Sequence, residues 1–573
     1  MPRSTGCRRR IGTGEASHNH PPKGAGLHPR SLADAPGRPL IDRPTGPSPK
    51  RNAGGETSCP TVPPEMVKDY RDDHVPIHGG QDMTAKKPIV GIGRETNEGY
   101  VGTDFAAPDV QDYVVAELRY EAPVAFTASH FTAPAVAAPQ AGRLNDVLAR
   151  YGIKRIRSQF GLSASTVGSR VEVAAALPPE PSTARFADRG MDADFIHSGF
   201  VQVVPERGRD ARAVAEALNR NHAIWKAYVA PRPVPAAVVN GSTAGSRNFE
   251  PAQGYLHAPP DGIGAAEVWN LPGAKGNGVT ICDIEGNWNR SHEDLPKGIP
   301  LLGGTVITDL GWRNHGTAVL GEIVSIPDGK GTVGISHEAN AAVHSAVVNG
   351  VFNAAAAITN AAAALSAGDV ILIELQATGP NGKYVAMQYW DDIFSAIVAV
   401  TAKGITVVEA AGNGDENFGL AVFAGTGLQK DSGAIVVGAG IPPTNHFDND
   451  NAYASIGVPR SRIWFSNYGK IVNVQAWGWH VTTLGYGDAQ GGGSQNRWYT
   501  LRFSGTSSAS PIVTGAVACI QGRSKAKNGA PLAPDKVRKI LMTTGTPQVG
   551  GPGVPVTQRI GPLPNLPKAM RSV

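Results

Sequence analysis

The sequence predicts an α/β domain with three layers (α/β/α), in which helices cover both faces of a mainly parallel central sheet. From Gly278 onward, short apolar segments alternate with longer helical segments. The short segments are apolar along their whole length rather than at every second position, which is typical of parallel strands buried on both faces. A small α+β region and a disordered N-terminal tail are expected to precede this domain.

Each expected strand is a short run rich in Val, Ile, Leu and Ala, and each expected helix is a longer apolar run with small residues. The strands are expected at 279–284, 341–348, 370–375, 405–409 and 434–438. Helical segments between them include 352–365 and 384–403. Polar residues at the ends of these strands are candidates for function, because open α/β sheets build their sites there.

Composition and periodicity divide the 573 residues into five parts. Residues 1–85 are rich in Pro and Gly and lack periodicity, so we expect a disordered tail. Residues 86–235 have the mixed periodicity of a small α+β region, and 236–254 form a linker. The main domain is expected at 255–550, and a Pro- and Gly-rich C-terminal tail at 551–573.

Composition argues against several classes of function. The net charge of +5 is small for this length, and the basic residues of the tail have no aromatic residues between them, so we expect no nucleic-acid binding. The four cysteines do not suggest a disulfide framework. The longest apolar stretch, 354–375, contains Asn360 and Asp369, so no membrane span is expected.

Four segments carry residue types that suit acyl transfer, in a fixed order. One strand carries Asp283 and Glu285, His315 precedes a Gly-Thr turn, Asn413 follows another strand, and Ser507 lies between a Gly-Thr turn and a helix. A serine hydroxyl needs an adjacent base, normally histidine. The histidine needs a carboxylate that fixes its tautomer. An asparagine amide can stabilise the tetrahedral oxyanion.

The order carboxylate, histidine, asparagine, serine resembles that of the subtilisin-like serine peptidases, or subtilases. The resemblance covers roughly residues 255 to 548. It implies a serine endopeptidase that acts on protein or peptide substrates, with Ser507 as nucleophile, His315 as general base and Asn413 as oxyanion donor. The matching motifs are His-Gly-Thr at 315–317, Ala-Ala-Gly-Asn at 410–413, Gly-Thr-Ser-Ser-Ala-Ser-Pro at 505–511, and the strand before Glu285 with His-Glu-Asp-Leu at 292–295.

The carboxylate is where the sequence departs from the family. Asp283 and Glu285 are two residues apart on one strand and therefore point to the same face. An ungapped comparison from Val279 to the motif at 292–295 puts Glu285 where subtilases carry their catalytic aspartate. The rival comparison keeps Asp283 and needs a two-residue insertion. Both residues stay candidates for the triad carboxylate.

A second departure concerns substrate binding. The segment 369–376 resembles the strand that pairs with the substrate backbone in subtilases, but Glu374 and Gln376 stand where the family usually has small residues. Glu409 likewise replaces a small residue in the strand that leads to Asn413. One hypothesis is a pocket for a basic substrate side chain. The alternative is that these acids find partners within the chain, because buried carboxylates are costly unless paired.

The region before the linker resembles the intramolecular propeptide of subtilases, which assists folding and blocks the cleft until it is cleaved. Its pattern is a strand at 200–204, an amphipathic helix at 210–221 and a strand at 224–229. We expect this N-terminal region to be an intramolecular inhibitor, removed by cleavage within 231–254, which is Pro-rich and open to proteolysis. A generic accessory α+β domain is the alternative interpretation.

No cofactor is expected to be required. Many subtilases bind calcium, but the segment 448–451 lacks the Gly and the final Glu of an EF-hand loop, so no structural calcium site is indicated. Relatives in this family are often exported, whereas the basic N-terminus is not followed by the apolar segment of a signal peptide. We expect a monomer.

A function of another class is kept as the alternative: a non-hydrolytic protein with the subtilase fold, used for binding or regulation. The unusual carboxylate segment and the acidic residues Glu374 and Glu409 motivate it. The presence of Ser507, His315 and Asn413 together favours the peptidase.

Overall fold

The structure is a computed structural model that describes residues 110–175, 193–235, 247–443 and 457–573. All of these residues belong to one compact unit. The expected tail at 1–85, most of the expected linker and the segment 448–451 lie outside the described residues.

The main domain is built on a sheet of seven strands, and every strand pair in it is parallel. The order of the strands across the sheet is β17-β16-β15-β12-β7-β9-β8. The five expected strands are present, and the sequence did not predict β8 or β17. The strands are β7 (Thr280–Glu285), β8 (Leu301–Gly303), β9 (Asn340–Ser345), β12 (Val370–Ile373), β15 (Thr406–Ala410), β16 (Ile435–Gly440) and β17 (Val472–Trp477).

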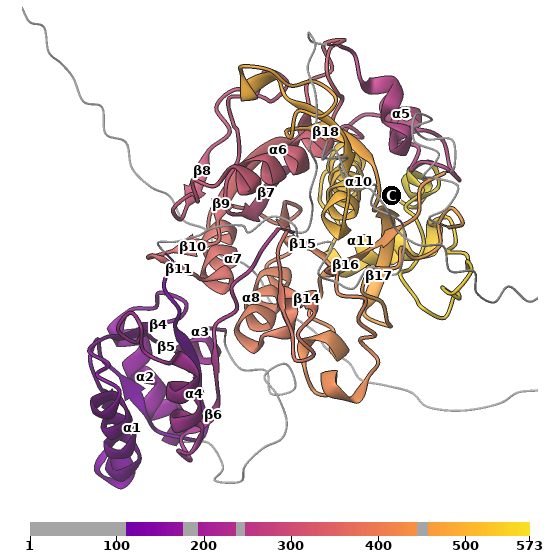
Figure 1. Ribbon diagram of the computed structural model, residues 1–573. Helices are drawn as coiled ribbons and strands as arrows, with labels where there is room; N and C mark the ends of the chain where they lie inside the picture. Colours follow the sequence, from indigo (N-terminus) through magenta and orange to yellow (C-terminus); the bar gives the residue numbers. More distant parts are fainter. Residues whose placement is uncertain (1–109, 176–192, 236–246, 444–456) are drawn as a thin grey trace, which may run out of the picture. The chain divides into compact units, whose positions relative to one another are not determined.

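Helices cover both faces of this sheet, and an apolar core lies between each layer of helices and the strands (Figure 1). Helices α6 (Leu310–Val324) and α10 (Thr506–Asn528) share one core, to which Leu372 contributes. Helices α7 (Ala354–Ala362) and α8 (Asp391–Ala402) share the other, to which Ile371 and Ile373 contribute. Neighbouring residues of one strand thus face opposite cores, and the predicted three-layer fold is confirmed.

Helix α10 is buried on all sides through its first four turns, from Thr506 to Gly522. It packs against α6 and against the strands β15, β16 and β17. Gly505, directly before the helix, has a φ of 128°. A side chain is disfavoured at this φ, so glycine permits the abrupt turn that begins the helix. The buried helix expected after the Gly-Thr turn is therefore present.

A smaller α+β region precedes the main domain. Its four strands form an antiparallel sheet in the order β4-β5-β1-β6. Asp210 caps α4, because its side chain accepts hydrogen bonds from the backbone N–H groups of Arg212 and Ala213. The elements are β1 (Val114–Leu118), α1 (Ala138–Arg150), β4 (Ile156–Ser158), α2 (Ala164–Ala175), α3 (Ala193–Ser198), β5 (Phe200–Val203), α4 (Ala211–Asn219) and β6 (Ile224–Val229).

Short elements complete the described chain. Two-stranded pairings join β2 to β3, β10 to β11, β13 to β14 and β18 to β19. Their bounds are β2 (Ala125–Phe126), β3 (Phe131–Thr132), β10 (Val347–Val348), β11 (Val351–Phe352), β13 (Gln376–Thr378), β14 (Tyr384–Ala386), β18 (Val481–Leu484) and β19 (Tyr499–Phe503). The remaining α-helices are α5 (Ala265–Val268), α11 (Pro534–Thr544) and α12 (Leu566–Ala569).

The C-terminal segment 551–573 packs into the main domain. Ile560 is buried in the core beneath α7 and α8, and Leu563 and Leu566 are buried in the core beneath α6 and α10. Leu563 also forms an antiparallel bridge with Thr546. Among the described helices, none combines the length and the apolar character needed to cross a membrane.

Candidate active site

The residues singled out from the sequence lie where strands of the sheet end and two helices pass. Glu285 is the last residue of β7, and Asn413 follows the end of β15. His315 lies in the second turn of α6, and Ser507 is the second residue of α10. Glu285, His315 and Ser507 have no exposed surface, and Asn413 is 5% exposed.

The structure brings Glu285, and not Asp283, to His315. Glu285 Oε1 lies 2.7 Å from His315 Nδ1. Asp283 Oδ2 instead accepts a hydrogen bond of 2.7 Å from Trp288 Nε1. Although both carboxylates lie on the same face of β7, only the one at the strand end reaches the histidine.

Burial sets the proton affinities of this pair. It lowers the pKa of His315 to about 3, so the imidazole is neutral near pH 7 and able to accept a proton. It also raises the pKa of the Glu285 carboxyl well above its usual range. The ring of Phe503 packs edge-on against His315, with 5.3 Å between the ring centroids, and helps to keep water from the pair.

Ser507 lies beside a loop that Asn413 holds in place. Asn413 Oδ1 accepts hydrogen bonds from the backbone N–H and the hydroxyl of Thr506, at 2.9 Å and 3.0 Å. Ser507 Oγ has no hydrogen-bond partner among the described residues. The hydrogen bond between Ser507 and His315 that nucleophilic attack needs is therefore not formed in this state, which is common in the absence of a reacting substrate.

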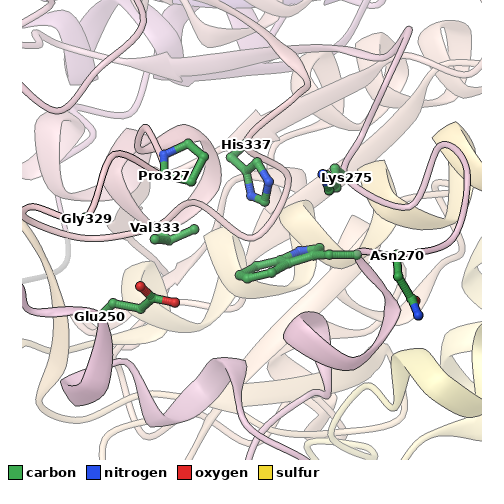
Figure 2. Close-up of a pocket in the computed structure, with 8 residues that line it drawn as sticks. Glu250, Asn270, Lys275, Pro327, Gly329, Val333 and His337 are labelled. Carbon is green, nitrogen blue, oxygen red and sulfur yellow. The ribbon is translucent and has the colours of Figure 1, made fainter.

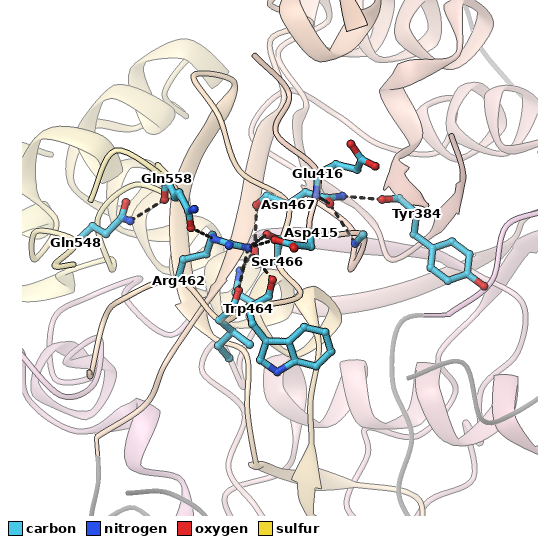
Figure 3. A network of polar contacts seen from close by, with 12 residues as sticks. Tyr384, Asp415, Glu416, Arg462, Trp464, Ser466, Asn467, Gln548 and Gln558 are labelled. Atoms are coloured by element: carbon cyan, nitrogen blue, oxygen red, sulfur yellow. Dashed lines mark hydrogen bonds and ion pairs between the residues drawn. The ribbon is translucent and has the colours of Figure 1, made fainter. Parts of the chain in front are cut away.

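A polar network supports the loop that carries Asn413, and Figure 3 shows its members. Asn467 donates to the carbonyl oxygen of Ala411 at 2.7 Å and accepts from the backbone N–H of Gly414 at 3.1 Å. Arg462 pairs with Asp415 at 2.8 Å and donates to nearby carbonyl oxygens. The motif Phe-Ser-Asn-Tyr-Gly at 465–469 therefore fixes the loop on both sides of Asn413 through hydrogen bonds.

The three residues predicted to bind substrate have partners within the chain. Glu374 Oε1 is hydrogen-bonded to Ser510 Oγ of α10. Gln376 Oε1 accepts the backbone N–H of Asn413 at 2.8 Å. Glu409 Oε1 accepts the backbone N–H of Gln388 at 2.7 Å. Glu374 and Glu409 are fully buried, and their role in substrate selection stays a prediction.

The end of the α+β region lies against the segment that carries Gln376. Val234 N–H donates to the Gln376 carbonyl oxygen at 2.9 Å, and Gln376 N–H donates to the Val234 carbonyl oxygen at 3.3 Å. This pairing adds a short antiparallel strand beside Gln376.

Further contacts of the α+β region reach the beginning of α8. Tyr228 and Gln159 donate to Asp392 at 2.7 Å each, and Lys226 pairs with Asp391 at 2.9 Å. Sequence reasoning missed this anchor, because the helix expected at 384–403 begins only at Asp391, where acids favour a helix start.

One pocket of about 410 Å³ lies elsewhere on the main domain (Figure 2). Glu250, Lys275 and His337 are among the residues that line it, and none of the predicted site residues does. Within the part of the chain that the structure describes, no group of three or more His, Cys, Asp and Glu residues is arranged to hold a metal ion. The expectation on calcium stays a prediction.

Comparisons with known proteins place the main domain in a family. The sequence profile of the subtilase family matches residues 276–561. No curated protein matches the chain.

Three solved structures are similar to the chain. A protease from Pseudoalteromonas arctica PAMC 21717 is 20% identical, with 57% of this chain and 98% of that chain covered and a TM-score of 0.41. Fervidolysin from Fervidobacterium pennivorans, described as a keratinolytic enzyme related to subtilisin, is 15% identical, with coverages of 81% and 61% and a TM-score of 0.47. The prenylagaramide maturation protease PagA is 19% identical, with coverages of 54% and 97% and a TM-score of 0.38.

The buried carboxyl groups make stability fall as pH rises. An acid whose pKa is raised by folding binds a proton more tightly in the folded chain, so stability is lost as pH increases toward the folded pKa. Histidines whose pKa is lowered by folding, such as His292 at about 4 and His315 at about 3, change the stability only below about pH 6.5. Between pH 6.5 and 8 the acids therefore dominate.

We expect Glu409→Gln to flatten this dependence, because burial raises the pKa of Glu409 to about 8. The wild type should lose about 1–2 kcal/mol more than the variant between pH 6.5 and 8. Urea unfolding at both pH values measures the difference. Glu338→Gln is the matched control, because Lys275 and Asn277 lower the pKa of this exposed acid and its titration lies below the window. Equal slopes for wild type and Glu409→Gln would contradict the expectation.

Proposed function

Because the chain belongs to the subtilase family of serine peptidases, we propose that it is an endopeptidase that hydrolyses peptide bonds through an acyl-enzyme on Ser507. The observation that carries this proposal is the 2.7 Å contact of Glu285 with His315, beside the first turn of the helix that bears Ser507. The contact supplies the oriented base without which a serine hydroxyl is a poor nucleophile.

Each group then has a defined task. Glu285 holds His315 through Nδ1, so that Nε2 accepts the proton of Ser507 as the hydroxyl attacks the carbonyl carbon. The same proton passes from Nε2 to the leaving amine, and water releases the acyl group by the reverse sequence. With Oδ1 of Asn413 turned to Thr506, its amide N–H group is the donor for the oxyanion.

The N-terminal α+β region acts as an inhibitor of the same chain, and the peptidase removes it by cleavage within 231–254. The antiparallel pairing of Val234 with Gln376 supports this, because an added strand is how extended peptides are held for cleavage or inhibition. The contacts of Tyr228 and Lys226 with the start of α8 keep the region attached until the chain is cut.

Ser507→Ala tests the peptidase directly. We expect the wild type to lose mass by cleavage within 231–254 and to digest casein, and the variant to do neither, with casein hydrolysis at least about 10³-fold lower. Intact-mass spectrometry and casein hydrolysis measure both results. If the folded wild type cuts neither itself nor casein, the chain is instead a non-hydrolytic protein used for binding or regulation.

The carboxylate is tested by a pair of isosteric variants. We expect Glu285→Gln to lower kcat by at least about 10³-fold, because His315 loses the group that fixes its tautomer. Asp283→Asn should cost less than about tenfold, because an amide oxygen still accepts from Trp288. Steady-state kinetics on one peptide give both values. The reverse ranking would assign the triad carboxylate to Asp283.

Specificity is tested with peptides that differ at one position. The hydrogen bonds of Glu374 and Glu409 within the chain lead us to expect that a Leu-containing peptide is cleaved at least as fast as its Arg counterpart. The ratio of kcat/KM for the two peptides measures this. A clear preference for Arg would instead support the pocket for basic side chains suggested by the sequence.

A further inference from the structure

Four buried carboxyl groups lie near one another, and one of them, Glu374, contacts α10, the helix that carries Ser507. Asp283 and Glu285 come from β7, Glu322 from α6, and Glu374 from the segment after β12. All four are completely buried. Glu374 lies between the others: burial first, and then the charges of Asp283 and Glu285, raise its pKa, and its own charge raises the pKa of Glu322.

Among the described residues, no Lys or Arg side chain balances the charge of these acids. Glu285 is paired with His315, and within the described chain none of the other three forms an ion pair with Lys or Arg. Both carboxyl oxygens of Glu322 and one of Glu374 lack a hydrogen-bond partner among the described residues. An ionised carboxylate in such a place is costly, and a carboxyl group usually avoids the cost by keeping its proton.

The hydrogen bonds of Ser510 point to the same protonation state. Ser510 Oγ is hydrogen-bonded to Glu374 Oε1 and also to the Thr506 carbonyl oxygen at 2.8 Å. A serine hydroxyl has one hydrogen, and a carbonyl oxygen has none to give. If Glu374 is a neutral acid, its hydroxyl group donates to Ser510 Oγ, and Ser510 Oγ donates to the Thr506 carbonyl oxygen. Each of the two hydrogen bonds then has its own hydrogen.

Ser507 is a second hydroxyl group in contact with Glu374. Its polar contact lowers the pKa of Glu374, although no hydrogen bond of ordinary geometry joins Ser507 Oγ to a described residue. Glu374 also holds Ser510, one turn further along α10. The carboxyl group therefore braces the first turn of the helix, where Ser507 is located.

We propose that Glu374 is a positioning residue for the reaction of Ser507, and that it does this as a neutral carboxylic acid hydrogen-bonded to Ser510. This inference rests on the proposed peptidase function. The neutral acid fixes the helix turn and adds no charge of its own beside the pair of Glu285 and His315. Ionisation of Glu374 at higher pH removes the hydrogen that it donates to Ser510 and adds a buried negative charge near Ser507.

The pH profile of the peptidase tests the proposal. For the full chain after self-cleavage, we expect kcat of the wild type to fall at alkaline pH by about tenfold per pH unit once Glu374 ionises. Glu374→Gln, whose amide also donates to Ser510 and cannot ionise, should retain kcat at pH 6 within about threefold and lack this alkaline fall.

Two further variants complete the test. Ser510→Ala removes the group that Glu374 holds, and we expect kcat to fall by about tenfold or more at pH 6 with little change in KM. Glu338→Gln, an exposed acid away from Ser507, should reproduce the wild-type profile. Circular dichroism at each pH restricts the comparison to folded protein.

Three outcomes overturn the proposal. The first is a Glu374→Gln profile with the same alkaline fall in kcat as the wild type. The second is a kcat of Glu374→Gln at pH 6 that is lower by more than about 10²-fold, and the third is an unchanged kcat in Ser510→Ala. The second outcome would assign Glu374 a role as a charged group. A wild type that is inactive toward peptides at every pH instead refutes the peptidase function itself, and titration of Ser507 with a serine-reactive sulfonyl fluoride separates that case from a positioning failure.

Discussion

The contact between Glu285 and His315 constrains the rest of the domain. Burying polar groups such as a carboxyl and an imidazole is costly unless they are hydrogen-bonded, so the pair needs a rigid framework that holds the two groups together. β7 lies inside the sheet between β12 and β9, and α6 is buried from His315 to Val324. These elements fix the two groups 2.7 Å apart, and the equally buried α10 brings Ser507 to the same edge of the sheet. The apolar cores thus orient the reactive groups.

The same burial limits how much charge the site can carry. In surroundings of low dielectric constant, like charges a few ångströms apart repel each other far more strongly than in water. Asp283, Glu322 and Glu374 are fully buried, and none of them pairs with a Lys or Arg side chain among the described residues. The arrangement is therefore stable only when most of them hold protons. Two of these acids have a hydrogen-bond partner: Asp283 accepts from Trp288 Nε1, and Glu374 is hydrogen-bonded to Ser510.

Much of the fold and part of the site could be predicted from the sequence. Strand and helix periodicity identified the layers, and short motifs located His315, Asn413 and Ser507 because turn and helix-start chemistry is local. The choice between Asp283 and Glu285 could not be made, since both point to one face of β7 and only tertiary distance separates them. The packing of 551–573 and the hydrogen bond from Tyr228 to Asp392 could not be predicted either, because they join segments far apart in the chain.

Gln376 joins two parts of the site. Its backbone pairs with Val234, and its side chain accepts the N–H of Asn413. Backbone pairing is nearly independent of sequence, so it supplies affinity, while pockets for alternate side chains supply specificity. A chain bound beside Gln376 is therefore held next to the loop on which the oxyanion donor lies. Under the proposed function, a substrate would use the backbone groups of Gln376 that Val234 occupies here, so binding of one would exclude the other at this strand edge.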